Sequence, residues 1–251
     1  MKLMELAGHL DKELSVSDFS DVSHNGLQVE AQGPVRRVCC GVDASLEFME
    51  QAASRKADLL ICHHGLSWGD SLSRITGLNY NRLKFLLNHN MALYACHLPL
   101  DAHRRLGNNA QLSAALGLRR LRRFGWYNGV QIGFAGFLPR AMPYERFKVR
   151  VCKLLKTELR TMDFGPGLVR TVAVVSGGAA DELDEAGRAG VDVFLSGEPK
   201  LSAWHLAREY GVNAVFGGHY ATETFGVRAL AEWLNRRFGL RAEFVDLATP
   251  Y

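Results

Sequence analysis

Short apolar runs alternate with amphipathic stretches along the whole chain. An apolar run bounded by turn residues predicts a buried strand, and apolar residues spaced three or four apart predict a helix. In the first half, strands are expected at residues 35–42, 57–62 and 91–96. Helices are expected at residues 3–14, 46–56, 80–90 and 108–116.

The second half repeats the same rhythm. Strands are expected at residues 131–138, 169–175, 191–195, 212–216 and 242–247. Helices are expected at residues 143–155, 181–189, 202–210 and 222–238. Strands that alternate with helices predict an α/β fold in layers, with sheets that are largely buried.

The least regular segment is residues 119–129, which mixes charged residues, glycine and aromatic residues. We expect a boundary between two lobes near it. We therefore expect an N-terminal lobe of residues 1–125 and a C-terminal lobe of residues 126–251, which together form one compact unit.

Composition and charge narrow the classes of function. Of the 251 residues, 47% are hydrophobic and 22% are charged, which excludes a disordered or fibrous chain. The net charge of +4 is too small for a dedicated duplex-binding domain. Basic runs do occur, at Arg104–Arg105 and at Arg119, Arg120, Arg122 and Arg123. A solvated face is the usual reason for such a run, and attraction for nucleotides or single strands is the alternative.

The cysteines and the N-terminal segment indicate in which cellular compartment the protein is expected. The five cysteines include no CxxC pair, and four of them lie in apolar runs, as buried reduced thiols do. The N-terminal segment carries charges every few residues, and no apolar run is long enough to span a bilayer. We therefore expect a cytoplasmic protein that does not bind membranes.

Side chains that bind metals follow three of the predicted strands. They are His63 with His64, Asp101, and His219 with Glu223. In α/β sheets, functional groups gather just beyond the carboxyl ends of the strands. A lone histidine at a strand end is usually a surface group, but three such strand ends together favour a metal site.

The spacing adds detail to this prediction. His63 and His64 are neighbours at a strand end, so they are expected to point to opposite sides and to serve different ions. His219 and Glu223 are four residues apart and share one face if a helix begins near His219. Three imidazoles and two carboxylates suit Zn, Fe, Mn, Co or Ni. Five ligands exceed what one tetrahedral ion needs, and a bridging carboxylate would let two ions use all five.

The segments around these residues resemble the NIF-three-like family, also known as GTP cyclohydrolase 1 type 2 homologs, in its short bacterial form. The matching segments, in the family's order, are HNGLQV at 24–29, ICHHGLSW at 61–68, ACHLPLD at 95–101, GNN at 107–109, SGEPK at 196–200 and GGHYATE at 217–223. They span nearly the whole chain, and together they are highly specific.

The resemblance implies two interlocked three-layer αβα lobes with a dinuclear metal site in the cleft between them. It implies that His64 and Asp101 bind one divalent ion, that His63 and His219 bind the other, and that Glu223 bridges them. It also implies a homohexamer, commonly a trimer of dimers. His97 is expected beside the site, as a residue supporting the ligands or an occasional ligand.

The leading functional hypothesis is a metal-dependent hydrolase acting on a small molecule, a nucleotide or a related heterocycle. Glu198 and His97 are the candidate acid/base groups. One alternative is a metal carrier or a ring-shaped adaptor without turnover. Another is a nucleic-acid damage-response factor, which would use the arginine runs.

Overall fold

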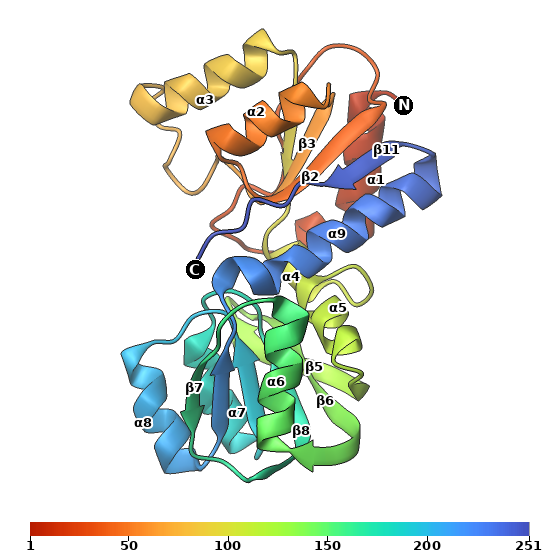
Figure 1. Cartoon of the computed structure of the whole chain (residues 1–251). Helices are drawn as coiled ribbons and strands as arrows, with labels where there is room; N and C mark the ends of the chain where they lie inside the picture. Colours follow the sequence, from red (N-terminus) through yellow and green to blue (C-terminus); the bar gives the residue numbers. More distant parts are fainter. Residues whose placement is uncertain (251) are drawn as a thin grey trace. The chain divides into compact units, whose positions relative to one another are not determined.

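The computed structural model describes residues 1–250 and divides into two compact units (Figure 1). Unit 1 comprises Met1–Leu100 and Gly226–Leu247. Unit 2 comprises Asp101–Phe225 and the residues from Ala248 onward. The chain therefore leaves unit 1 after Leu100 and returns to it after Phe225, so neither unit is a simple half of the sequence.

Unit 1 is built on a five-stranded sheet in the order β1-β4-β3-β2-β11. Its strands are β1 (Gly26–Val29), β2 (Arg37–Asp43), β3 (Leu59–His64), β4 (Ala92–Ala95) and β11 (Arg241–Phe244). All neighbours are parallel except β1, which pairs antiparallel with β4 at the edge. Parallel pairing brings the carboxyl ends of β2, β3 and β4 to one edge of the sheet.

Helices cover both faces of this sheet. They are α1 (Leu3–Leu14), the 3-10 turn η1 (Val16–Asp18), α2 (Leu46–Ser54), α3 (Gly77–Asn88), the start of α4 (Leu98–Ala102) and most of α9 (His219–Phe238). Phe48 of α2 and Leu86 of α3 join Leu60 and Leu93 of the strands in one buried cluster. Figure 1 shows α1 and α9 on the side of the sheet opposite α2 and α3. A sheet covered on both faces needs continuous apolar strands, which the runs around Leu60 and Leu93 supply.

Unit 2 is built on a six-stranded sheet in the order β5-β6-β8-β9-β10-β7. Its strands are β5 (Arg119–Tyr127), β6 (Val130–Pro143), β7 (Arg160–Asp163), β8 (Leu168–Val174), β9 (Val193–Ser196) and β10 (Asn213–Phe216). The central strands β8, β9 and β10 are parallel, and the outer pairings are antiparallel.

The helices of unit 2 also lie on both faces of its sheet (Figure 1). They are α5 (Asn108–Ala115), α6 (Tyr144–Leu155), the 3-10 turn η2 (Ala180–Glu182), α7 (Leu183–Arg188) and α8 (Leu201–Tyr210). Leu112 of α5 and Phe147 of α6 pack against Val172 and Leu195 of the strands in a second buried core. The predicted α/β class, with two sheets layered by helices, is confirmed.

The predicted boundary between residues 125 and 126 does not match this division, because it would cut through β5. The segment 119–129, the least regular in the sequence, is instead largely an edge strand that pairs with β6. Its arginines are exposed except Arg123, which is half-buried. Polar edge strands lack the apolar run by which strands are recognised in a sequence. β7, another edge strand, escapes prediction for the same reason.

Among residues 1–250, none of the helices combines the length and the apolar character that crossing a bilayer requires.

Candidate metal centre

Unit 1 gathers three histidines at the carboxyl edge of its sheet. His63 and His64 end β3, and His97 follows β4. One ligand atom from each of the three rings lies within 4.8 Å of the other two. The sheet produces this meeting because β3 and β4 are parallel neighbours, so both strands end at the same edge.

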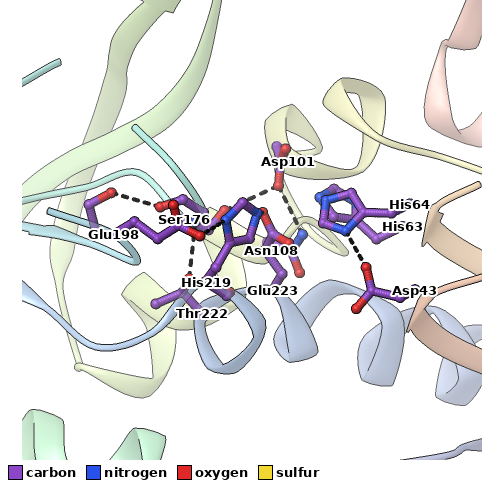
Figure 2. Close-up of polar contacts among 12 residues, drawn as sticks. Asp43, His63, His64, Asp101, Asn108, Ser176, Glu198, His219, Thr222 and Glu223 are labelled. Atoms are coloured by element: carbon purple, nitrogen blue, oxygen red, sulfur yellow. Dashed lines mark hydrogen bonds and ion pairs between the residues drawn. The ribbon is translucent and has the colours of Figure 1, made fainter. Parts of the chain in front are cut away.

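Each of the first two rings is held by an oxygen acceptor at the end of a neighbouring strand or just after it. His63 Nδ1 lies 2.9 Å from the carbonyl oxygen of Cys96, and His64 Nδ1 lies 2.8 Å from Oδ1 of Asp43 (Figure 2). A carbonyl oxygen only accepts, so Nδ1 of His63 carries the proton. In both rings Nε2 is then the nitrogen suited to a metal, the arrangement typical of histidine ligands.

The prediction that His63 and His64 point to opposite sides is wrong. Their ring centroids lie only 4.7 Å apart, and the planes of the two rings make an angle of 44°. Side chains alternate between the two faces of a sheet only within a regular strand, and these two residues are the last of β3. One ring bonds to the chain after β4 and the other to Asp43 of β2, so each takes its orientation from a different neighbour.

His97 is held by a carboxylate that lies far from it in the sequence. Its Nδ1 lies 3.0 Å from Oδ1 of Asp21, whose side chain is only 1% exposed. Asp21 also accepts hydrogen bonds from Asn25 Nδ2 and from the backbone N–H of Leu98. Burial alone would raise the pKa of Asp21, but the bonds from His97 and Asn25 lower it to about 2. Asp21 is therefore ionised and fixes the His97 ring.

Unit 2 contributes the remaining predicted ligands. Asp101 lies in α4, His219 is the first residue of α9, and Glu223 follows one turn later. Glu223 Oε1 lies 3.1 Å from His219 Nε2, and a carboxylate oxygen of Asp101 lies within 4.8 Å of one of Glu223. Because α9 begins at His219, the four-residue spacing places the side chains of His219 and Glu223 on the same face of the helix.

Glu198, which follows β9, lies behind His219. Its Oε1 is 2.7 Å from His219 Nδ1 (Figure 2). Burial would lower the pKa of His219, but the hydrogen bonds and charges of Glu223 and Glu198 raise it to about 9. His219 is thus cationic at neutral pH without a metal ion, and an ion that bound there would have to displace its Nε2 proton.

Polar partners hold Asp101 in place. Its Oδ1 accepts from Asn108 Nδ2 at 2.9 Å and from Ser176 Oγ at 3.1 Å. Asn109 Oδ1 in turn accepts from the backbone N–H of Ser176. Asn108 and Asn109 are fully buried and neither caps α5, because the N-cap position is Gly107.

Gly177 makes the closest backbone approach to the pair His219 and Glu223. Its φ of +69° lies in the left-handed region, and its N–H donates to Thr222 Oγ1 at 3.0 Å. A Cβ at this position would clash with Glu223 Oε1 and lie 3.1 Å from His219 Nε2. Only glycine meets both conditions without strain.

The residues present fit a metal site of imidazole and carboxylate type. Each of the four histidines, His63, His64, His97 and His219, has Nδ1 bonded to an oxygen acceptor within its own unit. This common arrangement sets the tautomer and the direction of each ring, as ligand-binding histidines require.

The structure also locates the residues that sequence reasoning missed. Asp43 ends β2, so the strand-end rule that identified the histidines could have found it. Asp21, Ser176 and Thr222 carry no comparable signal, because only the fold brings them to the ligands. The two candidate acid/base groups, Glu198 and His97, both lie at the ligand sets, and their roles stay predictions.

The fold and the donor sets define a class: a two-unit α/β protein whose strand ends carry nitrogen and oxygen donors of the kind that divalent metals accept. The chain belongs to the Duf34/NIF3 (NGG1p interacting factor 3) family, whose sequence profile matches residues 1–250.

Relatives match the chain along its full length. A "GTP cyclohydrolase 1 type 2 homolog" of Archaeoglobus fulgidus is 43% identical over 249 residues, with 99% of each chain covered. Among solved structures, protein ybgI, of unknown function, superposes with a TM-score of 0.92 at 39% identity and covers 100% of both chains. A protein from Thermus thermophilus superposes with a TM-score of 0.91 at 39% identity, again over 100% of both chains.

Proposed function

We propose that His63, His64, Asp101, His219 and Glu223 together hold two divalent metal ions and that the protein is a metal-dependent hydrolase. The observation that carries this proposal is the common arrangement of the histidines, each with Nδ1 bonded to an oxygen acceptor. The ions would be Zn, Fe, Mn, Co or Ni, which accept nitrogen and oxygen donors. When bound, such ions polarise a scissile group and lower the pKa of water.

The chain's own residues have defined parts in this proposal. Asp43 and the carbonyl of Cys96 orient the two β3 histidines, and Glu198 orients His219. Glu223 is the proposed bridging carboxylate, because it is buried and contacts His219 while lying near Asp101. Asp21 and His97 form a hydrogen-bonded pair that can hold or move a proton at His97 Nε2.

The proposed substrate is a nucleotide or a related heterocycle. Support comes from the relatives, which carry the name GTP cyclohydrolase 1 type 2 homolog. The test is a screen of metal-loaded protein with GTP, other nucleotides and phosphoesters. His64→Ala should abolish turnover, while His205→Ala, an exposed histidine on α8, should leave it unchanged. Rates that survive His64→Ala would sink the hydrolase proposal.

A metal carrier is the second candidate. The side chains of His64 and His219 keep 21% and 30% of their surface exposed, so an ion held there is reachable by an acceptor. This role requires rapid transfer of metal to an apo acceptor protein and no turnover in the substrate screen. Retention of the metal under competition from the acceptor would contradict it.

We also propose a ring-shaped assembly, a cytoplasmic location and, as an alternative function, a role with nucleic acid. A homohexamer, arranged as a trimer of dimers, should appear in light scattering as six times the chain mass. A role with nucleic acid requires salt-dependent binding to single or nicked strands. Cell fractionation should place the protein in the cytoplasm.

A further inference from the structure

An open pocket of about 370 Å³ lies in unit 2, away from every residue of the ligand sets. It is lined by three arginines and three apolar residues, Arg119, Arg120, Arg170, Phe137, Leu138 and Pro139. Arg170 is near the start of β8, whereas Ser176 and Gly177 follow the end of that strand. The pocket therefore lies toward the opposite end of the strands from the candidate metal ligands, roughly 20 Å along a strand of this length.

Two irregularities in the sheet involve the residues that line this pocket. In β5, Arg120 and Leu121 together oppose the single residue Gly136, because the pairing shifts between Arg119 and Arg122. In β6, the pairing with β8 shifts between Phe137 and Met142, so that several residues oppose Arg170 alone. Bulges of this kind redirect side chains and interrupt the ladder. Pro139 fits the second bulge, because proline within a central strand removes a ladder hydrogen bond.

The backbone of Arg120 is held in an unfavourable conformation. Its φ is +54°, in the left-handed region that residues with a Cβ seldom adopt. The next residue, Leu121, packs closely on Gly136 of β6, where an added Cβ would lie 2.7 Å from the Leu121 side chain. Strained residues of this kind gather at functional sites. Here the strained residue is an arginine that lines the pocket, at a position where glycine would be unstrained.

The three guanidinium groups have no acidic counterpart. Among residues 1–250, no carboxylate forms an ion pair with Arg119, Arg120 or Arg170. The nearby carboxylate of Asp192 accepts instead from the backbone N–H groups of Arg170 and Thr171. The pocket thus carries a concentrated positive charge that a bound anion would neutralise.

We propose that this pocket binds a nucleoside diphosphate or triphosphate as a second ligand site. Guanidinium groups bind phosphate oxygens in a bidentate manner, and three of them balance the charge of a diphosphate. Phe137 is 39% exposed and Pro139 is also exposed, so these two lining residues offer an apolar wall for a base. The volume lies within the range of pockets that enclose ligands of this size.

Calorimetry with ADP, at low ionic strength and without added divalent metal, tests the proposal on the full chain. Arg120→Gln and Arg170→Gln should each weaken ADP binding about tenfold, the loss expected for one charge-assisted hydrogen bond. Arg208→Gln, an exposed arginine on α8, is the matched control and should bind ADP like the wild type. His64→Ala should also retain ADP binding, which separates this pocket from the candidate metal centre.

Two further probes test the class of ligand. Pyrophosphate should bind more weakly than ADP, and Phe137→Leu should remove that difference while leaving pyrophosphate binding intact. Equal binding of pyrophosphate and ADP would overturn the assignment to a nucleotide. The proposal also fails if ADP does not bind at millimolar concentration, or if the arginine variants bind it normally. It fails equally if those variants change the oligomeric state without changing ADP binding, because the pocket is then a contact between copies.

Discussion

Glu198 offers the sharpest test of how the candidate metal centre is built. The sequence suggested an acid/base role, but the structure places its Oε1 2.7 Å from His219 Nδ1. In that position the carboxylate orients the ring and keeps a proton on Nδ1, which would leave Nε2 as the nitrogen available to a metal ion. Glu198→Gln keeps an acceptor oxygen and removes the charge, and Glu198→Ala removes both.

The expected magnitudes follow from the geometry. The Glu198 side chain is 48% exposed, so solvent screening limits its charge contribution to about 1 kcal/mol. Glu198→Gln should therefore weaken metal binding about fivefold. Glu198→Ala also frees the ring to rotate and should weaken it about 10- to 100-fold. In the metal-free protein, Glu198→Gln should lower the pKa of His219 from about 9, yet leave it above 6.5 because Glu223 remains.

Metal affinity is measured by competition with a chromophoric chelator, and the pKa of His219 by NMR titration of the metal-free protein. Glu209→Gln is the control, since Glu209 is an exposed carboxylate in the last turn of α8. The positioning role is refuted if Glu198→Gln and Glu198→Ala bind metal like the wild type while the His219 pKa stays at about 9. Loss of turnover with both quantities unchanged would instead identify Glu198 as a proton-transfer group.

Three further predictions concern single residues. Gly177→Ala should destabilise the protein by more than about 1 kcal/mol in urea unfolding and abolish metal binding, because its Cβ would meet Glu223 in a strained backbone. Retained metal affinity would contradict this. Asp21 has a pKa lowered to about 2, so its stabilising effect is present above pH 3.8 and is lost as the pH falls through 2. In Asp21→Asn, the free energy of unfolding should fall less steeply between pH 3.8 and pH 2 than in the wild type. Acid-unfolding curves that run parallel for the two proteins would argue against this. Arg120→Gly should raise stability by up to about 1 kcal/mol, because glycine relieves the left-handed strain but is more flexible when unfolded. A lower melting temperature for Arg120→Gly would show that the guanidinium also stabilises the fold.

Much of the fold could be predicted from local patterns. The apolar runs at 57–62 and 212–216 correspond to β3 and β10, and the donors that follow them lie at the strand ends. These features are recognisable because burial on both faces demands a continuous apolar run, and the chain must become polar where the strand ends. The start of α9 at His219 likewise agrees with the four-residue spacing of its two donors.

Other features depend on which distant segments pair. β11 joins β2 and so returns the end of the chain to unit 1, which no local pattern reveals. The register of β2 against β3 brings Asp43 beside His64, and the pairings of β6 with β5 and β8 bring Arg120 and Arg170 to one pocket. The sequence by itself determined the α/β class, the family and the chemistry of the candidate ligands, because each of these depends only on the types of residue and their local spacing. Tertiary structure decided the partners of those ligands, the direction of the His63–His64 pair and the division into units, because hydrogen bonds and packing join residues that lie far apart along the chain.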